Sequence, residues 1–304
     1  MTRPEELTAA ILAPPLAPIG PSDRQLVRHR LLDAVPALVE KLPVGDQIVV
    51  TLPLLRRADR DPESLGAPEE PFVWKPRFVR RSLGLSAIDA CLQRRFSTPG
   101  EAVGPIAGEA VAEWGRTGWR TFHWEPWLAA LSPAARSAVL AEAATWATAL
   151  WSSIDWRPLA PSVRLGGPDD QWVCPAARTV RLKGRSEVQI PIETSGGGEA
   201  GGGIGGDAGG GAGGGAGGGA GRTTVVSVAS GVPANGWEAE LGFLALVASL
   251  RSPARPVPAR VVGLWPDAGQ HRSVDITPGI LAAAGHRVIA GIAAVVGARL
   301  STVR

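Results

Sequence analysis

A glycine-rich tract interrupts the second half of this chain. Of the 26 residues at positions 196–221, 18 are glycine. Such a segment has almost no apolar surface to bury, so we expect it to be disordered. As a flexible coil it would span roughly 28 Å from end to end. A phosphate-binding loop would need a Lys followed by Ser or Thr between a strand and a helix, and the tract offers neither. The packed part of the protein must therefore be built from the segments on either side.

The segments that flank the tract have the patterns of strands and helices in alternation. Residues 179–193 predict a strand or a pair of strands with apolar side chains at alternate positions, and residues 224–229 predict the next strand. The later elements are a helix, a strand, a turn, a short extended stretch and a long helix beginning at Thr277-Pro278, at residues 238–250, 259–265, 266–270, 274–276 and from 277 onward. This order predicts an α/β domain with a mixed sheet.

The upstream part of the chain is mainly helical in pattern. Residues 1–70 form an N-terminal segment with a helix at 23–40 and a buried strand at 46–55, and a charged, proline-rich linker follows at 56–71. We therefore expect a second domain at 71–304, with the glycine-rich loop inside it. Its helices should include residues 82–95, residues 103–114 and a helix that begins at Ser132-Pro133, where an N-cap residue precedes proline.

The overall charge gives little support for nucleic-acid binding. The formal net charge of the 304 residues is +3, because 31 Lys and Arg nearly balance 28 Asp and Glu. Only a local basic patch could therefore attract nucleic acid. Lysine occurs only at Lys41, Lys75 and Lys183, so most basic residues are arginine. Abundant Ala, Gly, Pro and Arg without tyrosine is typical of a GC-rich genome, and we expect a bacterial protein. Arginine also makes bidentate phosphate contacts, but genome bias explains the count more simply.

Cysteine usage and hydropathy indicate a cytoplasmic protein. Cys91 and Cys174 are too few and too far apart for a disulfide framework or a zinc site, so we expect reduced, inert thiols. The N-terminus has an acidic pair and an apolar run broken by proline, unlike a signal peptide. No apolar run approaches about 20 residues without proline or charge, so we expect no membrane span and no membrane partner.

Two short sequences connect this chain to a known family. Gly184-Arg185-Ser186-Glu187 lies in the strand region before the tract, and Val226-Ser227-Val228-Ala229-Ser230-Gly231 lies in the strand after it. With the element order around them, they resemble the RecB-type PD-(D/E)XK nucleases, whose two strands carry Gly-Arg-x-Asp and Asp-x-Lys. The resemblance covers about residues 72–300. It implies a restriction-endonuclease-like mixed sheet flanked by helices, within an α/β (α+β) fold. The tract then falls in the hairpin between the motif strands, where an insertion costs little loop-closure entropy.

Most motif positions hold residues without the family's chemistry. Glu187 stands at the first Asp position, Ser227 at the second Asp position and Ala229 at the Lys position. The resemblance implies hydrolysis of a phosphodiester with Mg²⁺ held by two carboxylates, while the Lys helps the attacking water. Ser227 offers a neutral oxygen and Ala229 offers nothing, so Glu187 is a vestigial catalytic residue and the metal ligand if any is bound. One carboxylate is a poor Mg²⁺ site, so we expect no cofactor.

Secondary positions of the family also differ. In the helix 238–250, Phe243 stands where the family has an aromatic residue and Ala239 where it has Gln. Upstream, Ala112 stands at the position of a metal-binding His. The resemblance therefore implies a degenerate nuclease-like protein that binds nucleic acid, such as DNA, or a protein partner without cleavage.

Two other functions stay open. Glu193, Glu238 or Glu240 could supply a displaced metal ligand beside Glu187, which would make the chain an active Mg²⁺-dependent DNA nuclease. Acidic residues such as Glu238 and Glu240 also suit the first turn of a helix for reasons of dipole alone. Alternatively, the chain is a structural or interaction protein with no role in nucleic-acid binding.

Aromatic and basic residues outside the motifs are weaker candidates. A tryptophan-rich stretch could stack bases, although large aromatic side chains in helices more often belong to the core. Its members are Trp114, Trp119, His123, Trp124, Glu125 and Trp127. A basic run could bind phosphate, although basic side chains at the start of a helix are more often solvated. It consists of Lys75, Arg77, Arg80 and Arg81, with Arg94 and Arg95 further on.

Overall fold

The chain folds as a mixed α/β protein. The computed structural model describes residues 3–14, 19–43, 45–66, 73–120, 122–160, 162–165, 170–185, 187–192, 222–229, 231–251 and 257–302. The glycine-rich tract lies outside these residues, so the disorder expected for it stays a prediction. The described elements up to residue 66 are α1 (Pro4–Leu12), α2 (Pro21–Val39), β1 (Ile48–Val50), α3 (Leu52–Arg60) and η1 (Pro62–Gly66). The next are α4 (Pro76–Leu92), α5 (Pro99–Thr117), α6 (Glu125–Ala130), α7 (Pro133–Ser153), β2 (Arg164–Leu165) and β3 (Asp170–Val173). They are followed by β4 (Val180–Gly184), β5 (Val188–Ile192), β6 (Arg222–Val228), α8 (Trp237–Arg251), β7 (Pro258–Trp265), η2 (Pro266–Ala268), β8 (Gln270–Asp275) and α9 (Pro278–Thr302).

The strands form two separate sheets. The larger sheet has the order β2-β5-β6-β7-β8, and the smaller has the order β1-β4-β3. In the larger sheet, β5 and β6 are antiparallel, whereas β6 and β7 are parallel and are joined through α8. β8 then pairs antiparallel with β7. The mixed sheet predicted for the C-terminal part is therefore confirmed, and the smaller sheet is an addition to it.

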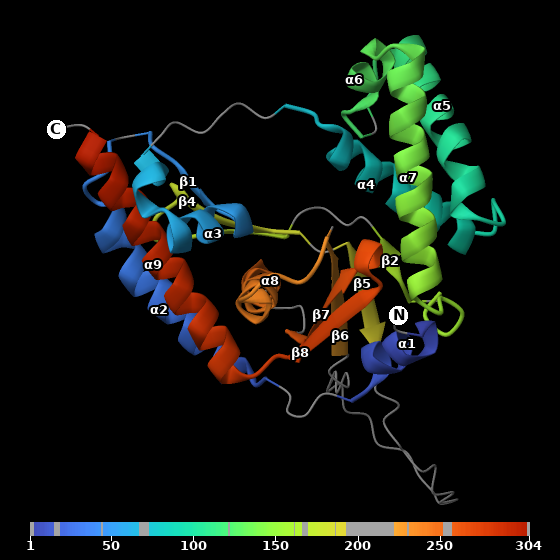
Figure 1. Ribbon diagram of the computed structural model, residues 1–304. Helices are drawn as coiled ribbons and strands as arrows, with labels where there is room; N and C mark the ends of the chain where they lie inside the picture. The colour runs from blue at the N-terminus through green and yellow to red at the C-terminus, as the bar shows by residue number, and fades with distance from the viewer. Residues whose placement is uncertain are drawn as a thin grey trace, which may run out of the picture.

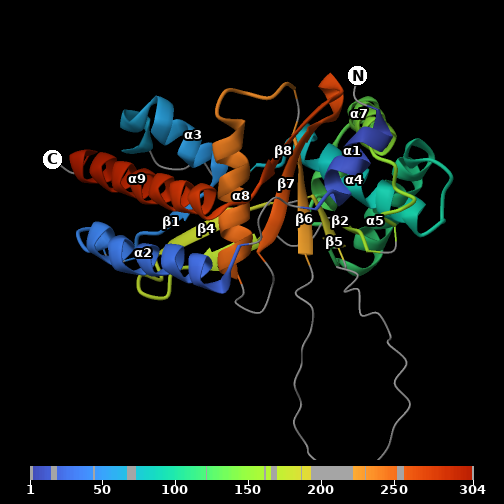
Figure 2. The ribbon, with the colours of Figure 1, turned by 90° about the horizontal axis from the view of Figure 1, so that it is seen from below.

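Helix α8 lies between the two sheets, as Figure 2 shows. It contacts β3 and β4 of the smaller sheet, β7 of the larger sheet and the long helix α9. A helix enclosed in this way must be apolar around most of its circumference, and nearly every residue from Leu241 to Leu250 is buried. Its side chains form one core with α2, α3 and α9. The apolar sequence of α8 therefore requires that this helix lie in the centre of the protein.

The other face of the larger sheet is covered by α1, α4 and α7 (Figure 1). Val188, Ile190, Val226 and Val262 point to this face, and Leu150 of α7 packs against them. Beyond this layer, α4, α5, α6 and α7 share a third core, with Trp124 fully buried in it. The helical part predicted between residues 82 and 153 is thus a bundle packed on one face of the sheet.

Arg260 on β7 ties α1 to the larger sheet. Its guanidinium Nε donates to the carboxylate of Asp275 on the neighbouring strand, at 2.5 Å. The same guanidinium donates to the backbone carbonyls of Ala10, Ala13 and Pro14 at the end of α1. Since the last carbonyls of a helix have no partner within it, this side chain caps α1 from outside.

The prediction of a single strand over residues 46–55 is wrong in its second half. The strand β1 ends at Val50, and α3 begins at Leu52. Thr51 caps this helix, because its side-chain oxygen accepts the backbone N–H of Leu54 at 3.4 Å, and Pro53 suits the first turn. The linker expected over residues 56–71 therefore contains the end of α3 and η1. The pattern was ambiguous because a short apolar run fits either a strand or a buried helical turn.

Segments from before and after residue 70 share one core. β1 pairs in parallel with β4, with Ile48 opposite Val180, and α2 packs along α9. Residues 67–72 lie outside the described part of the chain, and the boundary near residue 70 stays a prediction. The predicted helix starts are confirmed at Ser132, whose hydroxyl accepts the N–H of Ala135, and at Thr277, whose hydroxyl accepts the N–H of Ile280.

Helix α9 is the one described helix that is long and apolar enough to span a membrane by length and composition. In this structure it packs against α2, α3, α8 and η1. Leu281, Val288 and Ile292 are fully buried in the core that it shares with α8. The core helices of globular proteins often meet the same length and composition criteria, and α9 has the contacts of such a helix.

Candidate functional site

A pocket of about 410 Å³ opens where β4, β6 and β7 end. The first two turns of α8, the start of α3 and one turn of α4 complete its wall. It lies at the end of the larger sheet away from Ile192 and Arg222, the residues that flank the glycine-rich tract. Its lining residues are Thr51, Leu52, Pro53, Arg56, Arg81, Lys183, Gly184, Arg185, Ser227, Val228, Ala229, Trp237, Glu240, Leu241, Leu244, Gly263 and Trp265. We call it the cationic pocket, for the charges described below.

The structure brings the three candidate motif residues together at this pocket. Ser227 and Ala229 line it and are half-buried at the end of β6. The backbone N–H of Glu187 donates to the carbonyl of Val226 at 3.2 Å, which places Glu187 beside Ser227 across the β5–β6 pair. The spatial convergence implied by the sequence resemblance is therefore present. The groups that converge are a carboxylate, a hydroxyl and a methyl.

Glu187 is buried beside the pocket and is bonded on both oxygens. Its side chain has 0% exposure. One oxygen forms an ion pair with the guanidinium of Arg81, and the other accepts the backbone N–H of Val228 at 2.5 Å. Arg81 comes from α4, which packs on the face of the sheet that carries β5, and its side chain is 28% exposed. The carboxylate of Glu187 thus has an arginine cation where the family would have a metal ion.

The Mg²⁺ that the resemblance implies for an active enzyme does not fit these residues. Mg²⁺ requires several oxygen ligands, and the oxygens of Glu187 already bind a guanidinium and a backbone N–H. Across the described residues, no group of three or more His, Cys, Asp or Glu side chains could share a metal ion. Glu187 therefore has the position of a metal ligand but the contacts of an ion-pair partner.

Four cationic side chains and one carboxylate line the pocket. Arg56 of α3 donates two hydrogen bonds to Glu240 of α8, at 2.5 and 2.6 Å. This hydrogen bonding raises the pKa of the Arg56 guanidinium further above its ordinary value, so Arg56 is permanently charged. Lys183 and Arg185 add two exposed cations at the end of β4, and Arg81 adds the fourth. Among the described residues, these four cations outnumber the carboxylates of Glu240 and the adjacent Glu187, so the site favours anions.

Tryptophan and glycine shape the apolar side of the pocket. Gly263 and Trp265 lie on the same face of β7, because they are two residues apart. A Cβ at position 263 would approach the Trp265 ring to 2.6 Å, so only glycine lets this ring lie against the strand. Trp237, half-buried at the start of α8, stands on the other side. Aromatic walls beside cations suit a ligand with both charge and flat apolar surface.

Among the other described candidates of the motif helices and of the displaced-ligand alternative, only Glu240 lines the pocket. Glu238 is exposed in the first turn of α8 and does not line the pocket, whereas Glu240 does. Glu193 lies outside the described residues. Ala112 is exposed on α5, while Phe243 is fully buried in the core around α8. Ala239 is exposed on α8 and lines no part of the pocket.

The tryptophan-rich stretch divides between core and surface. Trp124 is fully buried, stacks on Phe122 with ring centroids 5.3 Å apart, and donates its indole N–H to Ser82. Trp114 and Trp127 are half-buried, whereas Trp119 is 72% exposed. Glu125 is buried and accepts the backbone N–H of Phe122. Trp124 and Glu125 are therefore structural, and His123 is exposed with a positive φ of 67°.

The basic run contributes one residue to the site. Arg81 reaches Glu187 and the pocket, whereas Arg77 is exposed and lies over the ring of Phe78. Sequence reasoning assigned no role to Arg56, Lys183 or Arg185. Lys183 and Arg185 flank Gly184, the first residue of the motif that ends at Glu187. Their closeness to Glu187 in the sequence could therefore have identified them as site residues. Arg56 lay in the stretch interpreted as a linker, and no sequence pattern placed it near α8.

Comparison with known proteins does not assign a family. No protein-family model matches this chain, no curated protein matches its sequence and no solved structure matches its fold. The resemblance to the PD-(D/E)XK nucleases therefore stays a prediction carried by the order of elements and the motif positions.

Proposed function

We propose that this chain is a degenerate PD-(D/E)XK (RecB-type) nuclease-like protein that binds nucleic acid in the cationic pocket without cutting it. The observation that carries the proposal is the group of cations around Glu187. Glu187 is neutralised by Arg81, and Arg56, Lys183 and Arg185 surround the same cavity. Cations at a concave site bind phosphate through charge and hydrogen bonds, and arginine does so with two parallel N–H groups.

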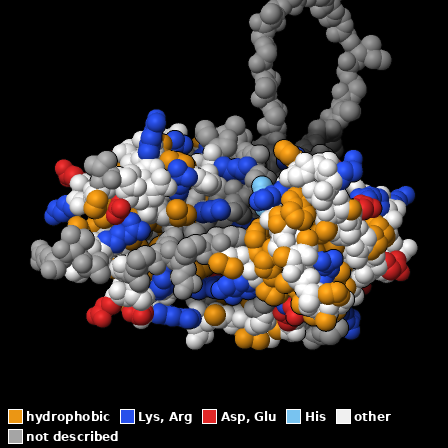
Figure 3. All heavy atoms as spheres, turned by 90° about the horizontal axis from the view of Figure 1, so that it is seen from above, with side chains coloured by type: hydrophobic (Ala, Val, Ile, Leu, Met, Phe, Trp, Pro, Cys, Tyr) orange, Lys and Arg blue, Asp and Glu red, His pale blue; other side chains and the backbone are white. Residues whose placement is uncertain are grey.

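The arrangement of strands and helices supports the family part of the proposal. The antiparallel pair β5–β6, the helix α8 and the parallel strand β7 follow one another in the order that the resemblance implies. The start of α8 also lies at the pocket, where the positive end of its dipole adds to the attraction for phosphate. In Figure 3, which views the molecule from above, Lys and Arg side chains are spread over both sides of the visible surface and its middle.

Hydrolysis is not expected from these groups. A phosphodiester needs an activated water and stabilisation of the charge that develops on the phosphate. Arg81, Arg56 and Lys183 can stabilise negative charge, but Ser227 and Ala229 offer no base to activate water. The carboxylate of Glu187 is engaged with Arg81. The chain's residues can thus bind and orient the backbone while leaving it intact.

The test is fluorescence anisotropy with labelled single- and double-stranded DNA and RNA over a range of salt concentrations. Phosphate binding predicts an affinity that falls steeply with salt. The Lys183→Glu/Arg185→Glu variant should lose more than tenfold in affinity and have a shallower salt slope. Arg178→Glu is the matched control, because Arg178 is exposed just before the opposite end of β4 and should leave binding unchanged.

A cleavage assay with Mg²⁺ or Mn²⁺ separates the proposal from the active-nuclease alternative. We expect no product from the pure folded protein. Metal-dependent cleavage would favour relocated ligands, of which Glu240 is the one described candidate that lines the pocket. Salt-insensitive or absent binding would contradict the proposal and favour a structural or interaction role.

A further inference from the structure

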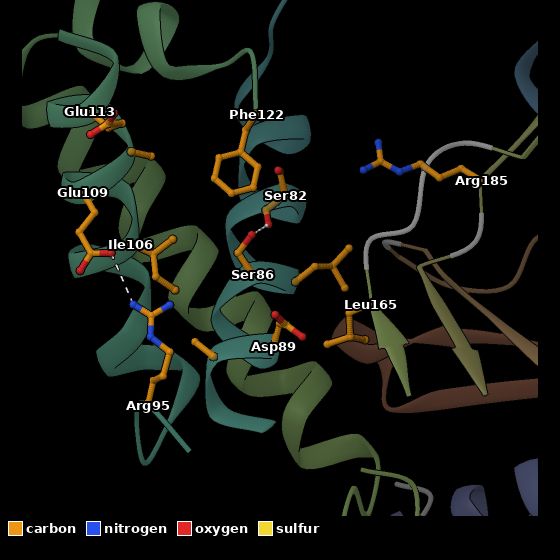
Figure 4. A pocket seen from close by; sticks show the side chains of 13 residues that line it. Ser82, Ser86, Asp89, Arg95, Ile106, Glu109, Glu113, Phe122, Leu165 and Arg185 are labelled. Atoms are coloured by element: carbon orange, nitrogen blue, oxygen red, sulfur yellow. Dashed lines mark hydrogen bonds and ion pairs between the residues drawn. The ribbon is translucent and has the colours of Figure 1, made fainter. Parts of the chain in front are cut away.

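A second pocket, of about 600 Å³, adjoins the cationic pocket. Its helical side consists of α4 and α5, and its strand side consists of Leu165 on β2 and Arg185 (Figure 4). Arg185 lines both pockets, and the consecutive residues Arg81 and Ser82 on α4 line one each. A chain bound at Arg185 can therefore extend directly from one pocket into the other.

The second pocket differs from the first in its chemistry. Leu85, Ile106 and Phe122 give it apolar walls, and the hydroxyls of Ser82 and Ser86 lie between them. Three carboxylates and two cations also line it, so a second phosphate is not favoured there. Its polar groups are mainly hydrogen-bond acceptors, which suit a neutral ligand that carries N–H donors.

The groups that face this pocket are held in place by contacts with one another and with neighbouring side chains. Asp89 accepts a hydrogen bond from the side chain of Gln93 at 2.7 Å, and Glu109 forms an ion pair with Arg95 at 3.5 Å. Phe122 is fixed by stacking on the buried ring of Trp124. In Figure 4, Arg185 extends from the strand side toward the helix that carries Ser82. The wall is therefore formed before any ligand binds, which lowers the ordering cost of binding.

We infer that the second pocket holds one unstacked nucleobase of a strand whose phosphate lies in the cationic pocket. The inference rests on the proposed function, and it specifies the ligand as single-stranded nucleic acid. The volume is in the range of small-molecule sites, and flat apolar walls such as Phe122 suit the face of a base. Carboxylates accept from the exocyclic amino group of a base, as Asp and Glu do with cytosine. Adenine and cytosine should therefore bind better than thymine.

The experiment compares labelled single strands of equal length that carry adenine, cytosine, thymine or no base, at one fixed salt concentration. Adenine and cytosine strands should bind about tenfold more tightly than the abasic strand, because stacking on an aromatic wall adds to phosphate binding. The exposed substitutions Asp89→Asn and Glu109→Gln should reduce the preference for adenine and cytosine over thymine about fivefold. Neither should weaken the binding of the abasic strand, because each removes a negative charge near the phosphate site. Glu142→Gln, at an exposed position on α7 that lines neither pocket, is the control.

The outcomes separate this inference from the proposed function. If abasic and base-bearing strands bind equally tightly and the salt dependence persists, the base pocket is wrong while the cationic pocket stands. If no strand binds in a salt-dependent manner, both are wrong. If base preference is present but Asp89→Asn and Glu109→Gln do not change it, the base lies elsewhere and the inference is overturned.

Discussion

Two arginine–carboxylate pairs on the larger sheet have the same chemistry but different surroundings. Arg260 and Asp275 join adjacent strands, and the remaining donors of Arg260 reach the backbone carbonyls at the end of α1. Arg81 instead comes from the helix α4 and pairs with Glu187 just before β5. The Arg260 side chain is only 10% exposed, whereas that of Arg81 is 28% exposed and lines a cavity.

The Arg260–Asp275 pair is structural, whereas the Arg81–Glu187 pair also contributes to a site. The donors of Arg260 are directed into backbone carbonyls, so this side chain completes the fold. Arg81 compensates a fully buried carboxylate and also presents a cation to the cavity. We infer that the charge of Glu187 is retained in this chain because it holds Arg81 at the pocket wall.

Arg81→Met should give the largest loss of stability. It leaves the buried carboxylate of Glu187 without its cation, which costs about 3–5 kcal/mol in the free energy of unfolding. The double variant Arg81→Met/Glu187→Gln should recover most of this loss, because it removes the uncompensated charge. Chemical denaturation measures both. Arg77→Met, at an exposed position on the same helix, is the control and should change stability by less than about 0.5 kcal/mol.

Recovery of stability without recovery of DNA affinity in the double variant would confirm that Arg81 serves the pocket. Full recovery of both would mean that this pair, like Arg260–Asp275, is only structural.

Arg260→Met should destabilise the fold by about 3 kcal/mol, because it removes the buried ion pair with Asp275 and the hydrogen bonds to the carbonyls at the end of α1. It should also raise amide hydrogen exchange in α1 while leaving salt-dependent DNA binding intact. Arg272→Met, at an exposed position on the adjacent strand β8, supplies the matched comparison. A loss of DNA affinity in Arg260→Met at temperatures where it is fully folded would remove the distinction between the two pairs.

Glu240→Gln should change stability by less than about 1 kcal/mol, because its partner Arg56 has a side chain that is nearly half exposed. It removes the one carboxylate among the described lining residues of the cationic pocket. Anisotropy should therefore report roughly fivefold tighter binding of DNA, from a Coulomb term of about 1 kcal/mol. Weaker binding would instead show that Glu240 orients Arg56 toward the phosphate.

The smallest effect concerns His271 on β8, which lines a pocket beside α1. Burial and then the nearby charge of Arg272 lower the pKa of His271 below its ordinary value of 6.5. The unfolded chain therefore binds more protons than the folded chain as the pH falls through 6.5, so stability is lost over that range. The loss levels off once the pH is below the lowered pKa of the folded state. His271→Gln should flatten this part of the curve of unfolding free energy against pH, and equal slopes in both proteins would contradict the assignment.

Hydrophobic patterning predicted the central elements of the fold. Residues 179–193 give the pair β4 and β5, and residues 224–229, 238–250 and 259–265 give β6, α8 and β7 nearly as expected. These segments have clear periods or long apolar runs. Patterning could not show that β4 and β5 belong to different sheets, since each pairs with strands distant in sequence. Such pairings depend on tertiary packing, which a local pattern does not encode.

The sequence predicted only those residues of the site that lie on the strands or directly beside them. Glu187, Ser227 and Ala229 meet as the resemblance implies, because the motif positions lie at fixed points of paired strands. The cations Arg81 and Arg56 arrive from α4 and α3, more than 100 residues earlier in the chain. Their contacts depend on how the helices pack, and no spacing in the sequence reveals them. The residues at the motif positions were therefore visible in the sequence, whereas the cations that surround them were not.

The segments that form the core around α8 are far apart in the sequence, so they leave the ribosome at different times. β1 and α2 emerge first, but their partners β4 and α9 follow more than 120 and 230 residues later. At 5–20 residues per second, a ribosome takes roughly 10–50 s to supply α9 after β1. During that interval the apolar side chains of α2 lack the cover of α9, whereas the bundle of α4–α7 can form from local contacts. We expect nascent chains of this protein to bind chaperones until α9 is released, which ribosome profiling of chaperone-bound chains can measure.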